Sequence, residues 1–210
     1  MQGLGVYGAG YFPPVERVLN SMFRLRHRVF KERLDWDVPS RDGIERDQFD
    51  DEDPVYLAYH GEDGEVVGCV RLLPTTGPNM IRDIFPHLAE EAIPADGRVW
   101  EVSRFGIDAG DDAVLGAGQI NTITYALVAG IHEVGLDYGL THMVAVMDVR
   151  IERILRRAGC AMRRIGRPRR IGNCVALAVE FEVSPIALED IRRNGGLTGR
   201  IAQHPLEEAA

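Results

Sequence analysis

The sequence predicts an α/β fold, a three-layer α/β/α sandwich in which helices cover both faces of one sheet. Apolar segments with the spacing of strands alternate along the chain with segments that have the spacing of helices. Such interleaving is typical of α/β layers rather than of a helix bundle or a barrel. The chain has 210 residues, 45% of them hydrophobic, which is enough for a substantial core. We therefore expect residues 1–210 to form a single domain.

The first helix is predicted over residues 15–30, where Val15, Val18, Met22 and Val29 recur at helical spacing. An acidic, turn-rich passage follows over residues 35–54. Beyond it the patterns predict strands at 55–59, 66–73 and 98–107, a helix at 120–134, a strand at 143–147, a helix at 149–158, a strand at 175–183 and a short helix at 185–193.

Composition excludes several classes of protein. No segment approaches the roughly 20 apolar residues of a membrane span, and the N-terminal residues lack the pattern of a signal peptide. Cys69, Cys160 and Cys174 are odd in number and widely spaced, which indicates neither a disulfide framework nor a zinc site. We therefore expect a cytoplasmic protein with no membrane association and no metal site.

Positive charge is concentrated in one segment. The whole chain carries a formal charge of −8, yet residues 149–172 contain nine arginines and one glutamate. A surface polarised in this way attracts an anionic partner. Nucleic acid is one alternative, but the acidic total and the lack of a DNA-binding motif argue against it.

Arg26 lies in the apolar stripe of the first predicted helix, between Met22 and Phe30. A guanidinium group facing a core requires a carboxylate partner. The alternative is an arginine at the edge of the stripe whose side chain extends into water.

The acidic passage after this helix offers such carboxylates. Asp47 and Asp50 flank Phe49 and follow Trp36, so that acidic and aromatic side chains alternate in one loop. This combination suits a cationic substrate that resembles an amino acid. The other acidic residues of the passage, including Glu45, are interpreted as solvated.

Two further charged positions interrupt predicted strands. Arg71 stands in an otherwise apolar run, either inside the strand facing a site or at the strand's end. Strict alternation places Glu101 and Arg104 on opposite faces, so that a common site requires a bulge between them. Buried Glu101 would have a raised pKa suited to a general base. A structural Glu101–Arg104 ion pair is the alternative.

Together these residues carry a resemblance. The ordered set Arg26-x-x-x-Phe30, Trp36, Asp47-x-x-Asp50, Arg71-Leu-Leu-Pro-Thr75 and Glu101-x-Ser103-Arg104 resembles the signature of the acyl-homoserine-lactone synthases, the autoinducer synthase family. The resemblance implies a fold related to the GNAT N-acetyltransferases, with a mixed, mostly antiparallel central sheet. It also implies two substrates, S-adenosylmethionine and an acyl thioester of acyl-carrier protein or coenzyme A, and no separate cofactor.

The same resemblance suggests roles for individual residues. Asp47 and Asp50 are expected to bind Arg26, Arg71 and Arg104 in an ordering network. The expected catalytic residues are Glu101, Arg104 and Arg71, and the substrate-binding residues are Arg26, Phe30, Trp36, Asp47, Asp50 and Ser103. The expected acyl pocket comprises Val102, Val144, Ala145 and Met147. The concentration of positive charge, rather than the resemblance, suggests the donor-docking surface, which comprises Arg150, Arg153, Arg156 and Arg157.

Two alternative functions remain open at this point. One is an ordinary N-acyltransferase that acylates another amine and forms no lactone. The other is a non-catalytic module that binds acyl-carrier protein through its arginines. The segment from Ala113 to Gly118 resembles an acetyltransferase pyrophosphate loop only weakly, because Ala113 replaces the usual Arg or Gln, and a simple loop is the favoured interpretation.

Overall fold

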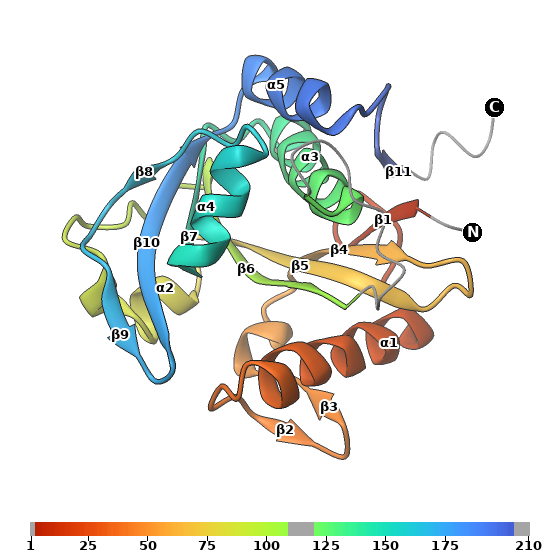
Figure 1. Cartoon of the computed structure of the whole chain (residues 1–210), viewed down its shortest axis with the longest axis horizontal. Helices are drawn as coiled ribbons and strands as arrows, with labels where there is room; N and C mark the ends of the chain where they lie inside the picture. The colour runs from red at the N-terminus through yellow and green to blue at the C-terminus, as the bar shows by residue number, and fades with distance from the viewer. Residues whose placement is uncertain (1–2, 109–119, 204–210) are drawn as a thin grey trace.

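The computed structural model describes residues 3–108 and 120–203, so that the segment around Ala113 and Gly118 lies outside the described residues. Within them, helices cover both faces of a nine-stranded sheet (Figure 1). The predicted three-layer α/β/α architecture is confirmed.

The sheet is mixed and mostly antiparallel, as predicted. Its strand order is β11-β1-β4-β5-β6-β7-β10-β8, with β9 also paired to β10, and the parallel pairs are β1–β11 and β6–β7. The strands are β1 (Gly3–Tyr7), β4 (Val55–His60), β5 (Val66–Pro74), β6 (Val99–Ile107), β7 (His142–Asp148), β8 (Arg163–Arg164), β9 (Arg169–Ile171), β10 (Cys174–Glu182) and β11 (Ala202–Gln203). A separate hairpin joins β2 (Ser40–Arg41) to β3 (Ile44–Glu45).

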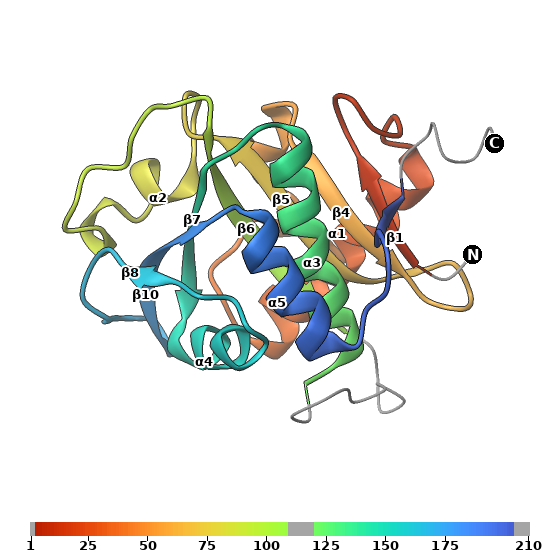
Figure 2. The ribbon, with the colours of Figure 1, turned by 90° about the horizontal axis from the view of Figure 1, so that it is seen from above.

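The helices form two layers around this sheet (Figure 2). Helix α1 (Glu16–Arg26), which continues as a π-helix over His27–Arg33, and the short α2 (Met80–Asp83) lie on one face. Helices α3 (Thr122–Asp137), α4 (Val149–Arg157) and α5 (Pro185–Gly195) lie on the other, where α5 packs on α3. Short 3-10 helices span Gln48–Asp51 and Pro86–Leu88.

Every helix and strand predicted from the sequence is present, with ends displaced by a few residues. The second predicted helix runs past Gly135, where it was expected to end, and reaches Asp137. A Cβ atom at Gly135 would lie 2.9 Å from side-chain atoms of Met143 and Val183. This glycine therefore allows α3 to approach the sheet closely instead of ending the helix.

The bulge required by a common site for Glu101 and Arg104 is present in β6. Arg71 of β5 pairs with Ser103, whereas Cys69 pairs with Gly106, so that Arg104 and Phe105 together oppose one residue of β5. Arg104 adopts a φ of 54°, in the left-handed region. The extra residue turns the Arg104 side chain to the face that carries Arg71 and Glu101.

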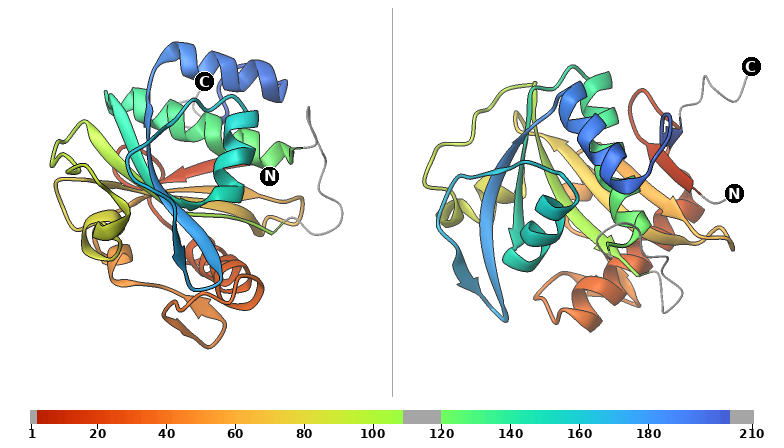
Figure 3. Two further views of the ribbon diagram at one scale, coloured as in Figure 1. Left: turned by 60° about the vertical axis from the view of Figure 1, so that its left-hand side comes forward. Right: turned by 45° about the horizontal axis from the view of Figure 1, so that its top comes forward.

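Strands β6 and β7 separate close to this bulge. They pair in parallel from Val99 with His142 to Val102 with Ala145, although β6 continues to Ile107 and β7 to Asp148. Beyond Val102 the two strands diverge, β6 with β5 and β7 with β10, and Figures 1 and 3 show the resulting change of direction. The two central strands are therefore unpaired at the end of the sheet where Arg104 lies.

The described residues bear on membrane helices, metal ligands and disulfides. No helix among residues 3–108 and 120–203 is long and apolar enough to cross a membrane. Within the same ranges no group of three His, Cys, Asp or Glu side chains is arranged to hold a metal ion. Cys69, Cys160 and Cys174 are free thiols, the first two of them buried.

One buried histidine lacks polar partners. His132 of α3 is 1% exposed and its ring lies 5.6 Å from the ring of Phe181. Neither ring nitrogen has a hydrogen-bond partner among the described residues. Burial therefore disfavours the imidazolium form and lowers the pKa of His132 to about 4.

We predict that His132 makes the protein acid-sensitive. Between pH 6.5 and pH 4 the unfolded chain protonates this side chain while the folded chain does not, so stability is lost as the pH falls through this window. The loss amounts to about 3 kcal/mol at pH 4. Urea unfolding of His132→Leu should show a shallower decline over this window than the wild type. The matched control, exposed His87→Gln, should follow the wild-type profile.

Candidate functional site

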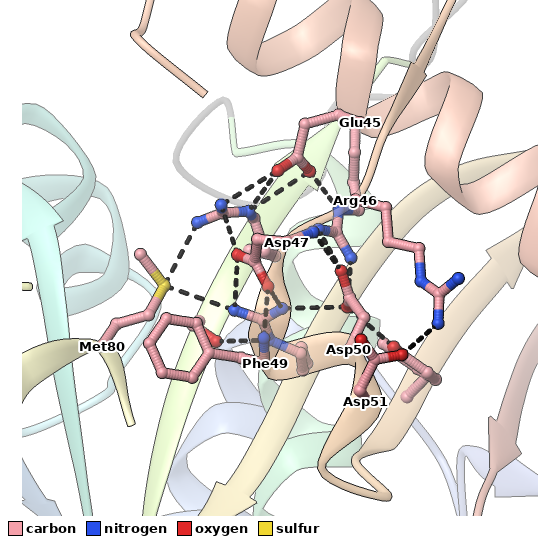
Figure 4. A network of polar contacts seen from close by, with 12 residues as sticks. Glu45, Arg46, Asp47, Phe49, Asp50, Asp51 and Met80 are labelled. Carbon is pink, nitrogen blue, oxygen red and sulfur yellow. Dashed lines mark hydrogen bonds and ion pairs between the residues drawn. The ribbon is translucent and has the colours of Figure 1, made fainter. Parts of the chain in front are cut away.

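Three buried arginines and three buried carboxylates meet on the α1 face of the sheet (Figure 4). Their side chains are at most 5% exposed. The arginines come from the end of α1, the middle of β5 and the bulge of β6, and the carboxylates come from β3 and the turn after it: Arg26, Arg71, Arg104, Glu45, Asp47 and Asp50. We call this set the arginine–carboxylate network.

Arg26 is bound through its whole guanidinium group. Its Nε donates to Glu45 Oε2 at 2.5 Å, and its two Nη atoms donate to the two oxygens of Asp50 at 2.7 and 2.9 Å. The ring of Phe23 lies 5.1 Å below the guanidinium carbon. Arg26 is 0% exposed, so the alternative of an arginine extending into water is wrong.

Arg71 connects the two aspartates to the next strand. Its Nη1 donates to Asp47 at 2.5 Å and to Asp50 at 2.9 Å, and its Nε donates to the Ser103 hydroxyl at 3.1 Å. Arg71 lies inside β5 and is 0% exposed, which excludes the alternative of a strand-end arginine. The Phe49 ring lies 5.5 Å from its guanidinium carbon.

Arg104 completes the network from β6. Its Nη2 donates to Glu45 Oε1 at 2.9 Å and to Asp47 Oδ2 at 2.6 Å. Its guanidinium carbon lies 5.5 Å from the centre of the Phe30 ring. Asp47 and Asp50 thus contact Arg26, Arg71 and Arg104 in the network expected from the sequence.

The charges of the network are mutually compensating. Burial alone would raise the pKa of Asp50, but the hydrogen bonds and the charge of Arg26, followed by the charge of Arg71, outweigh burial and hold that pKa well below its usual range. Arg26 responds in the opposite sense, because its two carboxylate partners raise its pKa in spite of burial. Asp50 and Arg26 therefore stay ionised, and the network brings three arginines against three carboxylates.

The turn that carries the carboxylates is shaped by its own hydrogen bonds. Asp47 accepts from the backbone N–H of Phe49 at 3.0 Å, and Asp50 accepts from the backbone N–H of Asp47 at 2.9 Å. This reciprocal capping begins the 3-10 helix Gln48–Asp51. Tyr56 of β4 donates its hydroxyl to Asp50 at 2.7 Å.

The interpretation of Glu45 as a solvated loop residue was wrong. Its side chain is 0% exposed and binds Arg26 and Arg104. Glu45, Asp47 and Phe49 are buried, whereas the intervening Arg46 and Gln48 are exposed. Burial at every second residue is typical of an extended segment with one buried face. The alternation of Glu45, Asp47 and Phe49 with other residue types was visible in the sequence.

Glu101 lies beside the network without forming an ion pair in it. It is 1% exposed, and its oxygens accept from the backbone N–H groups of Met80 at 3.1 Å and Ile81 at 2.7 Å. Burial raises the pKa of Glu101, and these two hydrogen bonds offset only part of the rise. Arg104 pairs with Glu45, so the alternative of a structural Glu101–Arg104 pair is wrong. Helix α2, which supplies both donors, was not predicted.

The aromatic residues expected at the site also meet. The rings of Phe30 and Trp36 stack with centroids 5.3 Å apart and planes inclined by 23°. Phe30 is buried and contacts Arg104, while Trp36 is half-buried at the surface of the same cluster. The π-helix after α1 positions Phe30, and the Trp36 backbone N–H donates to the Phe30 carbonyl at 2.9 Å.

The residues expected to form an acyl pocket lie on two faces of the sheet. Val144 shares a face with Glu101, its partner in the β6–β7 register, and packs in a cluster with Ile81. Ala145 and Met147 belong with Val102 to the core on the opposite face. The alternation of side chains along β7 accounts for this division.

The arginines expected to dock a donor lie on α4, and all four are exposed: Arg150, Arg153, Arg156 and Arg157. Arg150 pairs with Asp148 at 2.9 Å, and Arg156 pairs with Glu152 at 3.0 Å. Further along the basic segment, Arg163 pairs with Glu91 and Glu180. Acidic residues from outside residues 149–172 therefore compensate part of the positive charge counted from the sequence.

We predict that removing the Glu45 charge destabilises the fold strongly. Glu45→Gln leaves Arg26 and Arg104 buried with fewer negative partners than positive charges, and breaking a buried pair in this way costs about 3–5 kcal/mol. Urea unfolding measures the loss. The control Glu52→Gln, an exposed residue of the same passage, should change stability by less than about 0.5 kcal/mol. A loss below about 1 kcal/mol for Glu45→Gln would contradict a structural role of this charge.

This chain is similar to known proteins of one family over most of its length. The family model described as "Autoinducer synthase" matches residues 15–191. An acyl-homoserine-lactone synthase of Agrobacterium fabrum (strain C58 / ATCC 33970) is 42% identical over 174 residues, which cover 82% of each protein. The solved structure of a CoA-dependent acyl-homoserine lactone synthase, BjaI, with SAM and isopentyl-CoA is 30% identical and superposes with a TM-score of 0.84, covering 97% of this chain and 93% of that one.

The fold alone extends to a wider group. A putative N-acetyltransferase from Lactobacillus plantarum superposes with a TM-score of 0.58 at 15% identity, covering 87% of this chain and 99% of that one. The fold is therefore shared with N-acetyltransferases, as the resemblance implied. The family match, by contrast, includes all residues of the arginine–carboxylate network and Glu101. The chain belongs to the autoinducer synthase family of acyl-homoserine-lactone synthases.

Proposed function

We propose that this chain acylates the α-amine of S-adenosylmethionine from an acyl thioester and then closes the lactone with release of methylthioadenosine. The observation that carries this proposal is a buried carboxylate, Glu101, held by two backbone N–H groups beside a network in which each arginine already pairs with other carboxylates. A carboxylate without an arginine partner is available to accept a proton. The BjaI structure, with its SAM and isopentyl-CoA, supports the choice of substrates.

In the first step the substrate amine must lose a proton. A free α-amine has a pKa of about 8 and is mostly protonated at neutral pH. Glu101 accepts this proton, and its raised pKa favours that transfer. The amine nitrogen then attacks the thioester carbonyl and an N–C bond forms. The C–S bond breaks as the thiolate leaves, and the thiolate takes up the second proton that the attacking nitrogen loses on becoming an amide. Arg104 and Arg71 border the reacting groups and stabilise negative charge that develops there.

In the second step the carboxylate of the acylated substrate attacks the carbon γ to it, next to the sulfonium. A C–O bond forms while the C–S bond breaks, and the bonding electrons pass to sulfur. Neutral methylthioadenosine and a neutral lactone result. Because the sulfonium and the thioester are both activated, the reaction requires no additional cofactor.

The remaining site residues have binding roles in this proposal. The stacked rings of Phe30 and Trp36 pack against the adenosyl end of the substrate. The sulfonium ion at that end is positively charged and is attracted to the face of an aromatic ring. Asp47 and Asp50, with Arg26, hold the site in shape. Ser103 fixes the direction of Arg71 through its hydroxyl.

The acyl chain has a route through the sheet in this proposal. Strands β6 and β7 stop pairing after Val102 and Ala145, so the chain passes between them from the Glu101 face to the opposite face. Val144 lines the entrance, while Val102, Ala145 and Met147 line the far side. Val144 and Ala145 offer no hydroxyl group to a substituted acyl chain, which favours an unsubstituted one.

The acyl donor docks at the end of β7, where α4 begins and where β6 and β7 have already separated. Helix α4 follows β7 directly and presents Arg150, Arg153, Arg156 and Arg157 to solvent. These arginines suit the acidic surface of an acyl-carrier protein, and equally the phosphates of coenzyme A. We place the enzyme in the cytoplasm, where its free thiols remain reduced.

One assay tests the function and the base together. The protein is mixed with S-adenosylmethionine and a panel of acyl donors, and mass spectrometry measures lactone and methylthioadenosine. The wild type should produce both in equal amounts. Glu101→Gln should lose at least about 100-fold in turnover, the usual contribution of a general base, with its circular dichroism unchanged. Amide without methylthioadenosine would instead indicate an ordinary N-acyltransferase, and carrier binding without turnover would indicate a non-catalytic module.

We predict that docking of a carrier-protein donor depends on salt. Arg153→Glu should raise the KM for acyl-carrier protein about tenfold at low ionic strength and about twofold at 0.5 M salt. The matched control is Arg17→Glu, an exposed arginine of α1 on the other face of the sheet, which should leave this KM unchanged. A KM for the carrier that is independent of salt and of Arg153 would contradict electrostatic docking on α4.

A further inference from the structure

Glu101 is held at the start of a helix that is too short to keep its own shape. Its two oxygens accept from the backbone N–H groups of Met80 at 3.1 Å and Ile81 at 2.7 Å, the first two residues of α2. Helix α2 has four residues, and an isolated helix of that length is not stable in water. The direction of these two N–H groups therefore depends on contacts from outside the helix.

Asn79, the residue before α2, makes the first of these contacts. It is fully buried, and its side-chain Oδ1 accepts from the backbone N–H of Arg82 at 3.0 Å. Its Nδ2 donates to the Gly77 carbonyl at 3.0 Å, which fixes the orientation of the amide. The Asp83 carboxylate accepts from the backbone N–H of Asn79 at 3.0 Å. Asn79 is thus a helix cap that is itself held at its backbone and at its side chain.

The four N–H groups at the start of α2 are all taken by side-chain oxygens. In chain order from residue 79 to residue 82, Asp83 accepts the first, Glu101 the second and third, and Asn79 the fourth. Without the Asn79 amide the fourth N–H would lose its partner, and the first turn of the helix would lose the bond that fixes its far end. Two donors are reserved for Glu101 only while this cap is in place.

A second set of contacts fastens α2 to the strands on either side of it. The Thr75 hydroxyl, at the end of β5, donates to the carbonyl of Val99 at the start of β6, at 2.8 Å. Arg82 Nη2 donates to the Thr75 carbonyl at 2.7 Å. The loop between β5 and β6 is therefore closed at its base, and α2 is anchored to the two strands that carry Arg71 and Glu101.

We propose that Asn79 is a positioning residue for the catalytic carboxylate: by capping α2 it directs the N–H groups of Met80 and Ile81 at Glu101 and so fixes the oxygen that accepts the substrate proton. This inference rests on the proposed function, in which Glu101 is the base. Asn79 acts only through the backbone of α2, because its own side chain bonds to Arg82 and Gly77. A general base works only within hydrogen-bond distance of its proton, and a displacement of about 1 Å can reduce turnover about 100-fold.

The two N–H groups also favour the ionised form of Glu101. Burial raises the pKa of this carboxyl, while the hydrogen bonds from Ile81 and Met80, and then the charges of Arg71 and Arg104, act to lower it. Losing one hydrogen bond to a charged group changes an acid dissociation constant about tenfold. Loosening of α2 therefore raises the pKa of Glu101 further, and turnover falls from the acidic side because a protonated carboxyl accepts no proton.

The other charged groups around Glu101 have partners of their own. On α2, Arg82 donates to a backbone carbonyl and Asp83 accepts from the backbone of Asn79. On β7, the register partner of Glu101 is the uncharged Val144. A neutral substitution at Asn79 therefore reaches Glu101 through the two N–H groups and not through a change of charge.

The pH dependence of turnover tests this inference on the full chain. Asn79→Ala removes the cap, whereas Asn79→Ser keeps a side-chain oxygen that can cap. Asn79→Ala should lower kcat about tenfold at neutral pH, move the acidic limb of the kcat profile about one pH unit higher, and leave the KM for S-adenosylmethionine within about twofold. Asn79→Ser should stay within about twofold of the wild type. The matched control, Ser184→Ala, removes the cap of α5 on the other face of the sheet and should follow the wild type.

A titration by NMR measures Glu101 without turnover. In protein labelled with carbon-13 at the glutamate carboxyl groups, the Glu101 signal is the one missing from Glu101→Gln. Its acid dissociation constant should be about tenfold smaller in Asn79→Ala than in the wild type, and unchanged in Ser184→Ala. Asn79→Gly also lacks the amide but disturbs a helix start less than alanine does, so it should change the constant in the same direction even if Asn79→Ala folds poorly.

Three results would overturn the inference. These are a Glu101 titration unchanged in both Asn79→Ala and Asn79→Gly, an equal loss of turnover in Ser184→Ala, and a loss in Asn79→Ser as large as that in Asn79→Ala. Circular dichroism checks the folding of each variant. Failure of the proposed function has a different signature, because a Glu101 titration that moves as expected while kcat and its acidic limb stay at wild-type values would refute Glu101 as the base and leave the positioning role of Asn79 intact.

Discussion

The constraint on which the rest of the structure depends is the burial of three guanidinium groups in one place. An isolated buried charge is costly by several kcal/mol, and only close, hydrogen-bonded counter-charges offset that cost. Arg26, Arg71 and Arg104 come from segments up to 78 residues apart, and each contacts at least two of the three carboxylates. The chain from residue 26 to residue 104 must therefore fold around this cluster, which explains why a 3-10 helix, a short hairpin and a π-helix occur together there.

The same requirement accounts for the irregular geometry of β6. A regular strand would direct Arg104 into the apolar core between the sheet and α3. The left-handed backbone of a non-glycine residue is itself unfavourable, and it persists where the surroundings compensate for it. Here the compensation is the pair of carboxylates, Glu45 and Asp47, that Arg104 reaches only from the bulge. The bulge also lies where β6 leaves β7, so one local distortion both completes the network and opens the sheet.

Much of this arrangement could be predicted from the sequence, because its signals are periodic. Side chains on one face of a long helix or strand recur every 3.6 or 2 residues, and a bulge was expected if Glu101 and Arg104 serve one site. What escaped prediction is short or depends on distant partners. Helix α2 has four residues, too few for a period, and its role depends on Glu101, which is 20 residues further along the chain. Glu45 resembled its solvated neighbours because only tertiary contacts distinguish it, although the alternation with Asp47 and Phe49 was visible.

The hydrogen-bond partners divide the site into a structural and a reactive part. Each of the three guanidinium nitrogens of Arg26 donates to a carboxylate at 2.9 Å or less, and the side chain is fully buried, which indicates a structural role. Glu101 is bound only by backbone N–H groups, which leave its charge uncompensated by any direct ion pair within the described residues. Arg71 and Arg104 lie between these parts, since each donates to Asp47 and also to the sulfur of Met80, which neighbours Glu101 through its backbone. The network thus holds the guanidinium groups of Arg71 and Arg104 and the carboxylate of Glu101 in fixed positions on one face of the sheet, and such preorganisation is what a catalytic site requires.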